Sequence, residues 1–268
     1  MSVRRIVILS VVGLLVGQAG AQAPVPVRDP QALALIASSL KALTGGTAVT
    51  DVTLQATVAF VAGSDQESGT AALTGKIGEE SLTQLSLTSG PRQQVRNGLL
   101  GAWSGPDGVS HCMSTPNCFT DASWFFPALT LEALSSNLQY DLTYLGPDSS
   151  TGAPLLHVQV GLVQAADSAT ASATILRIST MDLYFDPQSF LPLVLDFKVH
   201  PDNDPGTDIP VEIQFGNFQS VSGGLAPFSI VEYLQGTLTL SFTVSSVVLN
   251  SGVPDSLFAV SCAQGVQP

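Results

Sequence analysis

The sequence predicts an α+β protein, mostly β, in which a strongly curved antiparallel sheet of about eleven strands surrounds one N-terminal helix. Two patterns lead to this fold class. Apolar and polar residues alternate along many short segments, as in residues 238–244, which is typical of strands with one buried face. Apolar residues three and four positions apart predict a helix over residues 29–43. The expected architecture is an unclosed barrel with a short helical lid.

The first 21 residues have the pattern of a signal peptide. Arg4 and Arg5 form a positive start, residues 6–16 form a short apolar run, and Ala19-Gly20-Ala21 is a small-residue cleavage site. The run is shorter than the roughly 20 apolar residues of a membrane-spanning helix. We therefore predict a periplasmic or secreted protein that has no stable membrane span after cleavage.

The remaining chain is expected to be a linker over residues 22–28 and a single domain over residues 29–268. One all-β domain can reach roughly 200–250 residues, so this length needs no second domain. Removal of residues 1–21 leaves 7 basic and 21 acidic residues, a net charge of −14. That charge argues against nucleic acid as a partner and against general attraction to an anionic lipid surface.

The N-terminal helix has clear start and stop signals. Asp29 can accept hydrogen bonds from free backbone N–H groups, and Pro30 suits the first helical position. Gly45-Gly46 can end the helix in a left-handed conformation. The predicted apolar stripe consists of Leu33, Ile36, Leu40 and Leu43.

The strands follow in two groups around an insertion at residues 111–137. The first group is predicted at residues 52–60, 69–77, 81–88, 92–100 and 103–110. The second group is predicted at residues 139–145, 155–162, 175–185 and 193–199, and within residues 208–258. Residues 165–174 are rich in Ser, Ala and Thr and are expected to form a mobile loop or a frayed hairpin tip.

Two details refine this picture. Short helices are expected over residues 121–126, stopped by Pro127, and over residues 130–136, capped by Thr130. In the last long strand the apolar positions change parity across Ser245-Ser246, which predicts a β-bulge and a bend in the sheet.

A curved sheet of this size has more inward-facing side chains than one helix can cover, so other residues must shield its concave face. The insertion supplies Trp124, Phe125 and Phe126, which are either ordinary lid or core aromatics or residues that gate a lipid pocket. Trp103 is a further candidate for a ligand-binding residue. Arg92 and Arg96 lie four apart on one strand face and could pair with an anionic group, although solvated arginines are favoured.

The three cysteines suggest a disulfide, since exported proteins commonly contain them. Cys112 and Cys118 are close in sequence within a turn-rich loop, and a bridge between them is favoured, which leaves Cys262 free or paired elsewhere. Binding of a metal by His111, Cys112 and Cys118 is disfavoured because three ligands without a partner pair make a poor zinc site.

The order of features in residues 208–258 resembles the C-terminal end of the periplasmic lipoprotein-carrier (LolA/LolB-like) superfamily. The matching features are a strand, the Gly223-Gly224 turn, the Pro227-Phe228 strand, a hydrophobic strand, Asn250, Pro254-Asp255 and Leu257-Phe258. The resemblance implies an unclosed antiparallel barrel, an N-terminal helix, and helices that block a cavity for an acyl chain.

These observations predict an exported, non-enzymatic binder or carrier of a hydrophobic or acylated ligand. The alternative is a structural or interaction module that meets an envelope protein through a sheet edge or outer face. The G-x-S-x-G hydrolase and H-E-x-x-H zinc-protease motifs are missing from the sequence, and no cofactor or metal is expected. Ser38-Ser39-Leu40-Lys41 matches the S-x-x-K hydrolase motif, but the S-D-N and K-T-G motifs that accompany it do not follow. Asp202, Asp204 and Asp208 could hold calcium, but their spacing departs from an EF-hand loop and favours a solvated turn.

Overall fold

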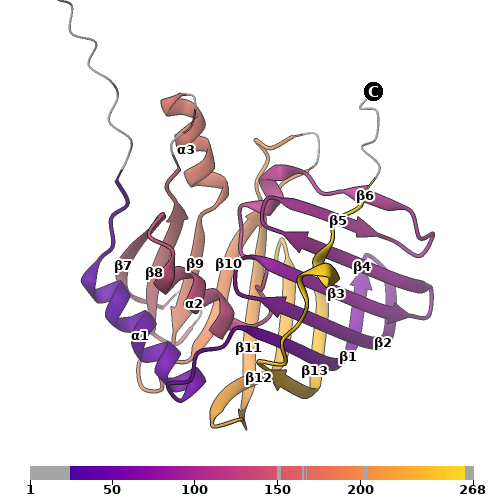
Figure 1. The fold of residues 1–268 in the computed structure, drawn as a ribbon, viewed down its shortest axis with the longest axis horizontal. Coiled ribbons are helices and arrows are strands. Elements are labelled where there is room, and N and C mark those ends of the chain that lie inside the picture. Colours follow the sequence, from indigo (N-terminus) through magenta and orange to yellow (C-terminus); the bar gives the residue numbers. More distant parts are fainter. Residues whose placement is uncertain (1–24, 150–151, 165, 167, 202–203, 263–268) are drawn as a thin grey trace, which may run out of the picture.

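The computed structural model describes residues 25–149, 152–164, 166, 168–201 and 204–262. Within these residues, thirteen strands form one antiparallel sheet in the order β6-β5-β4-β3-β2-β1-β13-β12-β11-β10-β9-β8-β7. The sheet is not closed into a barrel, because β6 and β7 lie at its two edges. The predicted fold class is confirmed (Figure 1).

The strands fall into two groups that meet where the first and last strands pair. The first group is β1 (Asp51–Ala62), β2 (Asp65–Lys76), β3 (Glu80–Leu87), β4 (Gly90–Asn97), β5 (Leu100–Ser104) and β6 (Ser110–Cys112). The second group is β7 (Tyr140–Asp148), β8 (Leu155–Leu162), β9 (Met181–Phe185), β10 (Pro192–Val199), β11 (Ile209–Val221), β12 (Gly224–Leu234) and β13 (Thr237–Leu249). The predicted strand at residues 103–110 is instead the end of β5, a turn and the start of the short β6.

The helix α1 (Pro30–Thr44) begins and ends as predicted. The Asp29 side chain accepts a hydrogen bond from the backbone N–H of Gln31, and Gly45 adopts a left-handed conformation at the C-terminus. The β11–β12 turn lies directly against this end of the helix. A Cβ atom at Gly224 would stand 2.1 Å from the carbonyl oxygen of Leu43, so only glycine fits there.

The predicted helix over residues 121–126 is wrong. Residues 122–125 form a turn, and Pro127 starts the helix α2 (Pro127–Ser136) rather than stopping an earlier one. Proline suits the first helical position because its missing N–H would have no helical partner there. Thr130 therefore lies inside α2, where its hydroxyl donates a hydrogen bond to the Asp121 carboxylate.

The prediction for residues 165–185 is also corrected. Residues 169–178 form the helix α3 (Ala169–Ile178), which projects beyond the sheet in Figure 1, and the strand β9 begins at Met181. Ser168 caps the helix by accepting a hydrogen bond from the backbone N–H of Ala171. Alanine has the highest helix propensity, so an Ser/Ala/Thr-rich run with a good cap forms a helix.

The predicted bulge lies between β1 and β13. Gln55 pairs with Ser246 and Ala56 pairs with Val244, which leaves Ser245 as the extra residue. A bulge of this kind increases the local twist and bends the strand. It stands at the centre of the sheet, where the two strand groups meet.

The concave inner face of the sheet holds the main hydrophobic core. Alternate residues of β1, such as Leu54 and Val58, point to this face and are buried against the helices. Both α1 and α2 contribute to it, and the largest fully buried side chains there include Phe125, Phe126, Leu129, Leu131 and Leu134. The α2 helix is therefore part of the core that fills one part of the concave side of the sheet.

The C-terminal tail covers the opposite, outer face of the sheet. The short 3-10 helix η2 (Asp255–Phe258) places Phe258, which is fully buried, against Leu82, Val95 and Ala102 of β3, β4 and β5. In Figure 1 the tail, drawn in yellow, crosses these strands. The Leu-Phe pair near the C-terminus is thus an anchor for the tail.

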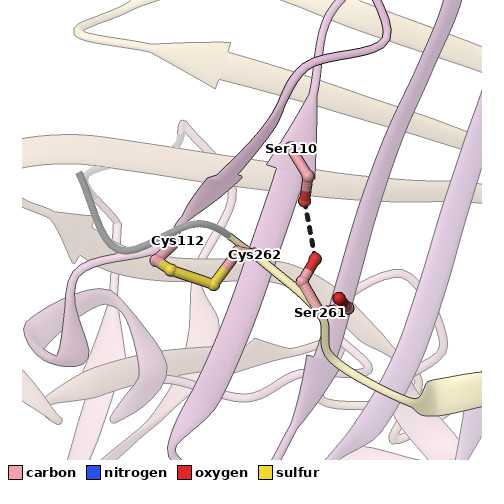
Figure 2. Close-up of a disulfide and its surroundings, with 4 residues drawn as sticks. All are labelled: Ser110, Cys112, Ser261 and Cys262. Carbon is pink, nitrogen blue, oxygen red and sulfur yellow. Dashed lines mark hydrogen bonds between the residues drawn. A yellow bond between two sulfur atoms is a disulfide. The ribbon is translucent and has the colours of Figure 1, made fainter.

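The predicted Cys112–Cys118 disulfide is wrong, because Cys112 is bonded to Cys262 (Figure 2). Cys112 pairs in register with Ala102, whose side chain faces the tail on the outer side. Cys118 is a buried free cysteine on the inner side, with its sulfur 3.2 Å from the position that a Cβ atom of Gly101 would occupy. The two cysteines therefore lie on opposite faces of the sheet.

The same junction carries a hydrogen bond from the Ser110 hydroxyl to the Ser261 carbonyl oxygen, at 2.8 Å. The disulfide and this hydrogen bond hold the tail on the edge strand β6. The predicted signal peptide at residues 1–21 lies outside the described residues. In the described part of the chain, no helix combines the length and apolar character needed to cross a membrane.

Loss of the Cys112–Cys262 disulfide should destabilise the protein. A Cys112→Ser/Cys262→Ser double variant is expected to lose about 2–5 kcal/mol of unfolding free energy, because the bridge closes a long loop. Urea unfolding followed by circular dichroism measures the change. A Cys118→Ser variant is the control for thiol content, and reductant should destabilise that control as it destabilises the wild type. An unchanged unfolding free energy in the double variant would contradict this structure.

Candidate functional site

A cavity of about 520 Å³ lies on the inner face of the sheet, beside the part that the helices fill. Its walls come from both strand groups. It is lined by Thr83, Leu85, Arg92, Gln93, Gln94, Arg96, Trp103, Ser104, Gly105, Pro106, Trp124, Phe197, Val199, Val211, Glu232, Leu234 and Leu240. The sheet curvature thus creates a space that the core leaves unfilled.

One wall of the cavity is largely apolar and belongs to β10–β13. Phe197 and Val199 lie on β10, Val211 on β11, and Leu234 and Leu240 on β12 and β13. Phe197 pairs directly with Val211, and Val211 with Leu234, so these side chains form a continuous row across the strands. This wall offers contact to a hydrocarbon chain.

The other wall is polar and belongs to β3–β5. Its centre is the inner face of β4, where Arg92, Gln94 and Arg96 follow at every second residue. Trp103 of β5 pairs with Gln94 and closes this wall. The Trp103 side chain stacks on His111 with 4.4 Å between ring centroids and is 42% exposed, so this end of the cavity meets solvent.

The predicted site residues separate into two pairs. Trp103 and Trp124 both line the cavity, although they are distant in sequence. Phe125 and Phe126 are fully buried in the core and do not line it. Trp124 joins the two pairs, because its ring meets Phe125 edge-on with 5.7 Å between centroids.

Arg92 is held by neighbours at the rim of the cavity. Its guanidinium group lies 3.4 Å from the Glu67 carboxylate and 4.5 Å from the centre of the Phe60 ring. Glu67 also accepts hydrogen bonds from the backbone N–H of Ser89 and the hydroxyl of Thr88, which lower its pKa. The charge of Arg92 is therefore partly balanced.

Arg96 is buried, with 3% of its surface exposed, so the expectation of a solvated arginine is wrong here. Its guanidinium group donates to the carbonyl oxygens of Cys118 and Thr120, at 2.6 and 2.9 Å. Among the described residues, the Nε–H of Arg96 has no hydrogen-bond partner. Arg96 thus joins the cavity wall to residues 113–126, which run from β6 to α2 and include η1 (Thr115–Cys118).

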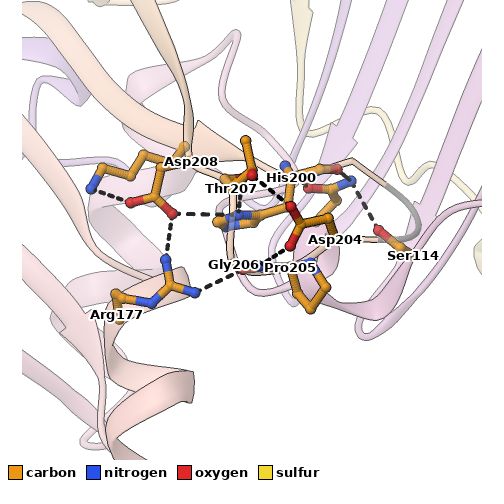
Figure 3. Close-up of polar contacts among 10 residues, drawn as sticks. Ser114, Arg177, His200, Asp204, Pro205, Gly206, Thr207 and Asp208 are labelled. Carbon is orange, nitrogen blue, oxygen red and sulfur yellow. Dashed lines mark hydrogen bonds and ion pairs between the residues drawn. The ribbon is translucent and has the colours of Figure 1, made fainter.

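The 113–126 segment is also fixed from the other side of the barrel. The Asn117 side chain donates to the carbonyl oxygen of His200, at 2.9 Å, and accepts from its backbone N–H, at 2.7 Å. His200 directly follows β10, and its ring nitrogen Nδ1 lies 3.1 Å from the carbonyl oxygen of Thr207 (Figure 3). The segment therefore bridges the two strand groups beside the cavity.

The acidic residues considered as calcium ligands have other partners (Figure 3). Asp208 forms ion pairs with Arg177 and Lys198, and Asp204 accepts hydrogen bonds from Gly206 and Thr207 within its turn. Asp202 lies outside the described residues. In the part of the chain that the structure describes, no group of His, Cys, Asp or Glu is arranged to hold a metal ion.

No family model matches this chain, and no curated protein matches it. Solved structures do. A LolA superfamily protein from Nitrosomonas europaea is 12% identical with a TM-score of 0.53, covering 85% of this chain and 97% of its own. The fold is LolA-like. At this level of identity the match concerns the fold.

Two further solved structures share this LolA-like fold. A domain assigned to an outer membrane lipoprotein-sorting protein from Vibrio parahaemolyticus is 13% identical with a TM-score of 0.51, covering 83% of this chain and 94% of its own. A DUF1329 family protein from Desulfovibrio piger is 11% identical with a TM-score of 0.50, covering 85% and 96%.

Sequence reasoning missed one acidic residue of the cavity. Glu232 lies on the apolar wall, where burial raises its pKa and the Thr239 hydroxyl donates to its carboxylate at 2.8 Å. The sequence contains a signal for this position, because Glu232 alternates in step with Ile230 and Leu234, whose side chains point inward from β12. An acidic residue at a strand position where the inward-facing neighbours are apolar indicates a polar position within a cavity.

A row of acidic residues crosses the outer face of the same sheet. Asp196 of β10 stands directly between Asp182 of β9 and Glu212 of β11, and its Oδ1 atom has no hydrogen-bond partner in the part of the chain that the structure describes. Burial, together with the like charges of Glu212 and Asp182, raises the pKa of Asp196 to about 7.

The two hydrogen bonds between Asn117 and His200, which hold the 113–126 segment to the end of β10, can be tested by mutation. An Asn117→Ala variant should lose about 1–3 kcal/mol of unfolding free energy, because it leaves the backbone groups of His200 without partners. It should also speed chymotrypsin cleavage after Phe119. An Asn97→Ala variant, which removes an exposed side chain, is the control and should stay within about 0.5 kcal/mol of wild type. Equal cleavage rates in both variants would count against the bridge.

The Asp196 carboxyl predicts a dependence of stability on pH. Its pKa is raised in the folded state, so the folded protein binds a proton more tightly, and stability falls as pH rises from about 4 to about 7. An Asp196→Asn variant should therefore be more stable than wild type by on the order of 1 kcal/mol at pH 8, after allowance for partial exposure. Urea unfolding at pH 8 and pH 5 measures this, with a smaller gain expected at pH 5. A gain that does not change with pH would refute the assignment.

Proposed function

We propose that this chain is an exported, non-enzymatic binder or carrier of a hydrophobic or acylated ligand. The observation that carries the proposal is the cavity on the inner face of the sheet, with its apolar wall on β10–β13. The volume of about 520 Å³ lies within the range of roughly 300–1,000 Å³ that is usual for small-molecule sites. An acyl chain in this space would remove apolar side chains from water, which is favourable by about 25 cal/mol per Å².

Export is supported by two features of the chain. Residues 1–21 have the three parts of a signal peptide. The Cys112–Cys262 disulfide is of a kind that forms and persists in oxidising compartments such as the bacterial periplasm. Both features support our proposal that the protein acts in the periplasm or outside the cell.

A role as an interaction module at a sheet edge has less support. The edge strand β6 is three residues long and carries the disulfide to the tail. The edge strand β7 already pairs with the segment before α1, through the bridge between Arg28 and Leu142. Both edges are therefore partly occupied, which leaves less backbone for an added strand.

Intrinsic fluorescence can test acyl-chain binding without a label. The chain has two tryptophans, Trp103 and Trp124, and both line the cavity. A dibrominated stearate quenches tryptophan on contact, so it should quench most of the emission and saturate at one ligand per protein. Unbrominated stearate should compete with it.

Two variants locate the quenching. Trp103→Phe and Trp124→Phe should each retain one quenched tryptophan, because each side chain contacts the same cavity. A surface-adsorbed ligand would instead give quenching that does not saturate. Absence of quenching at all ligand concentrations would overturn the proposed function.

A further inference from the structure

We propose that the cavity selects amphiphiles with an anionic head group, a carboxylate or a phosphate, and that the basic row of β4 binds this group. The basic row is defined as Arg92, Gln94 and Arg96. This inference rests on the proposed function, since it assumes that the apolar wall takes the hydrocarbon chain. It adds the chemistry of the other end of the ligand.

The cavity has one apolar wall and one basic wall. The apolar row from Phe197 to Leu234 faces the inside of the barrel from β10–β12, while the basic row faces it from β4. A purely apolar ligand would leave the basic row without a matching partner. An amphiphile places its chain on one wall and its polar end on the other.

The buried charge of Arg96 is the strongest reason to expect an anion. No ion pair within 4.0 Å is found for Arg96 among the residues that the structure describes; its two hydrogen bonds go to neutral carbonyl oxygens. Burial of a charge without a close opposite charge is costly, and within the described part of the chain the Nε–H of Arg96 also has no acceptor. Because Arg96 lines the cavity, an anion there would bring the opposite charge close to its guanidinium group.

The acidic groups of the protein nearby do not remove this need. Asp121 interacts electrostatically with Arg96, but among the described residues no ion pair within 4.0 Å joins them. The Asp121 carboxylate instead accepts hydrogen bonds from the Thr130 hydroxyl and the backbone N–H of Ser123. Glu232, the acid among the described lining residues, lies on the opposite wall, where burial raises its pKa as well.

The placement of arginine is unusual for this chain. Residues 22–268 contain four arginines, and two of them, Arg92 and Arg96, line the cavity. The net charge of residues 22–268 is −14. General electrostatic attraction therefore cannot draw an anion to this protein, and short-range contacts must bind it. Arginine suits this task, because its planar fork of N–H donors matches carboxylate and phosphate oxygens.

Glu67 sets the availability of Arg92. Its carboxylate lies 3.4 Å from the Arg92 guanidinium group and competes with an incoming anion for it. Hydrogen bonds from Ser89 and Thr88 hold Glu67 in place. Removal of the Glu67 charge should therefore strengthen the binding of an anionic head group without any new contact.

The test compares ligands with the same chain and different head groups, with the full mature protein at pH 8. The probes are oleate, oleoyl lysophosphatidic acid, oleyl alcohol and inorganic phosphate alone, and the dissociation constants come from tryptophan fluorescence and calorimetry. Oleate and the lysophosphatidic acid should each bind at least about tenfold more tightly than oleyl alcohol. Inorganic phosphate should bind far more weakly than the lysophosphatidic acid.

Three variants and a control assign this preference to the basic row. Arg92→Gln and Arg96→Gln should reduce the ratio between oleate and oleyl alcohol affinities severalfold, whereas Glu67→Gln should increase it. Lys41→Gln removes a positive charge from an exposed position of α1 and should leave the ratio unchanged. Because Arg96 also holds residues 118 and 120, Arg92→Gln and Glu67→Gln decide the outcome if Arg96→Gln fails to fold.

The outcomes separate the two proposals. If oleate and oleyl alcohol bind equally well, the head-group proposal is overturned and the acyl-chain proposal stands. If inorganic phosphate binds as tightly as the lysophosphatidic acid, the site is one for free anions and selection of an amphiphile is refuted. If none of the probes binds, both proposals fail together.

Discussion

The structure depends on one constraint, which is that a bent sheet has an inner face too large for its own helices to cover. The bulge at Ser245 bends the centre of the sheet, and alternate residues of every strand then point to one concave side. The helices α1 and α2 and the aromatic pair Phe125-Phe126 fill part of this space. What they leave is the cavity, so the candidate site follows from the shape of the sheet.

The 113–126 segment makes this arrangement rigid. It is tied to β4 through Arg96 and to the end of β10 through Asn117, so it connects the two strand groups away from the β1–β13 pair that joins them in the sheet. Buried polar contacts of this kind specify one arrangement, because each group would be costly to leave without a partner. The charge of Arg96 therefore serves the fold through the carbonyl oxygens of Cys118 and Thr120.

Much of the fold could be predicted from the sequence, because local patterns decided it. The cap at Asp29, the left-handed end at Gly45 and the change of parity at Ser245-Ser246 each depend on neighbouring residues and were confirmed. Helix boundaries were predicted less well, since Pro127 can either stop a helix or start one, and the choice rests on the packing of α2. The Ala-rich run before Arg177 was mistaken for a loop because low complexity obscured its helix propensity.

The disulfide shows where sequence proximity misleads. Cys112 and Cys118 are near in sequence but stand on opposite faces of the sheet, whereas Cys262 lies 150 residues from Cys112 and beside it in space. Prediction of the candidate site from the sequence had the same limit. Trp103 and Trp124 could be predicted as cavity residues, but the surroundings of Arg96 and Glu232 depend on strands that are distant in the chain.

The position of Cys262 also sets an order of events in the life of the chain. The sulfur that fixes the edge strand β6 lies 150 residues after Cys112 and follows the strand β13 in the chain. The sheet and helices of residues 30–249 can pair before that residue exists, but the edge strand must wait for it. Covalent closure of this edge therefore comes after the synthesis of β13, and a chain truncated before residue 262 would lack the disulfide that holds β6.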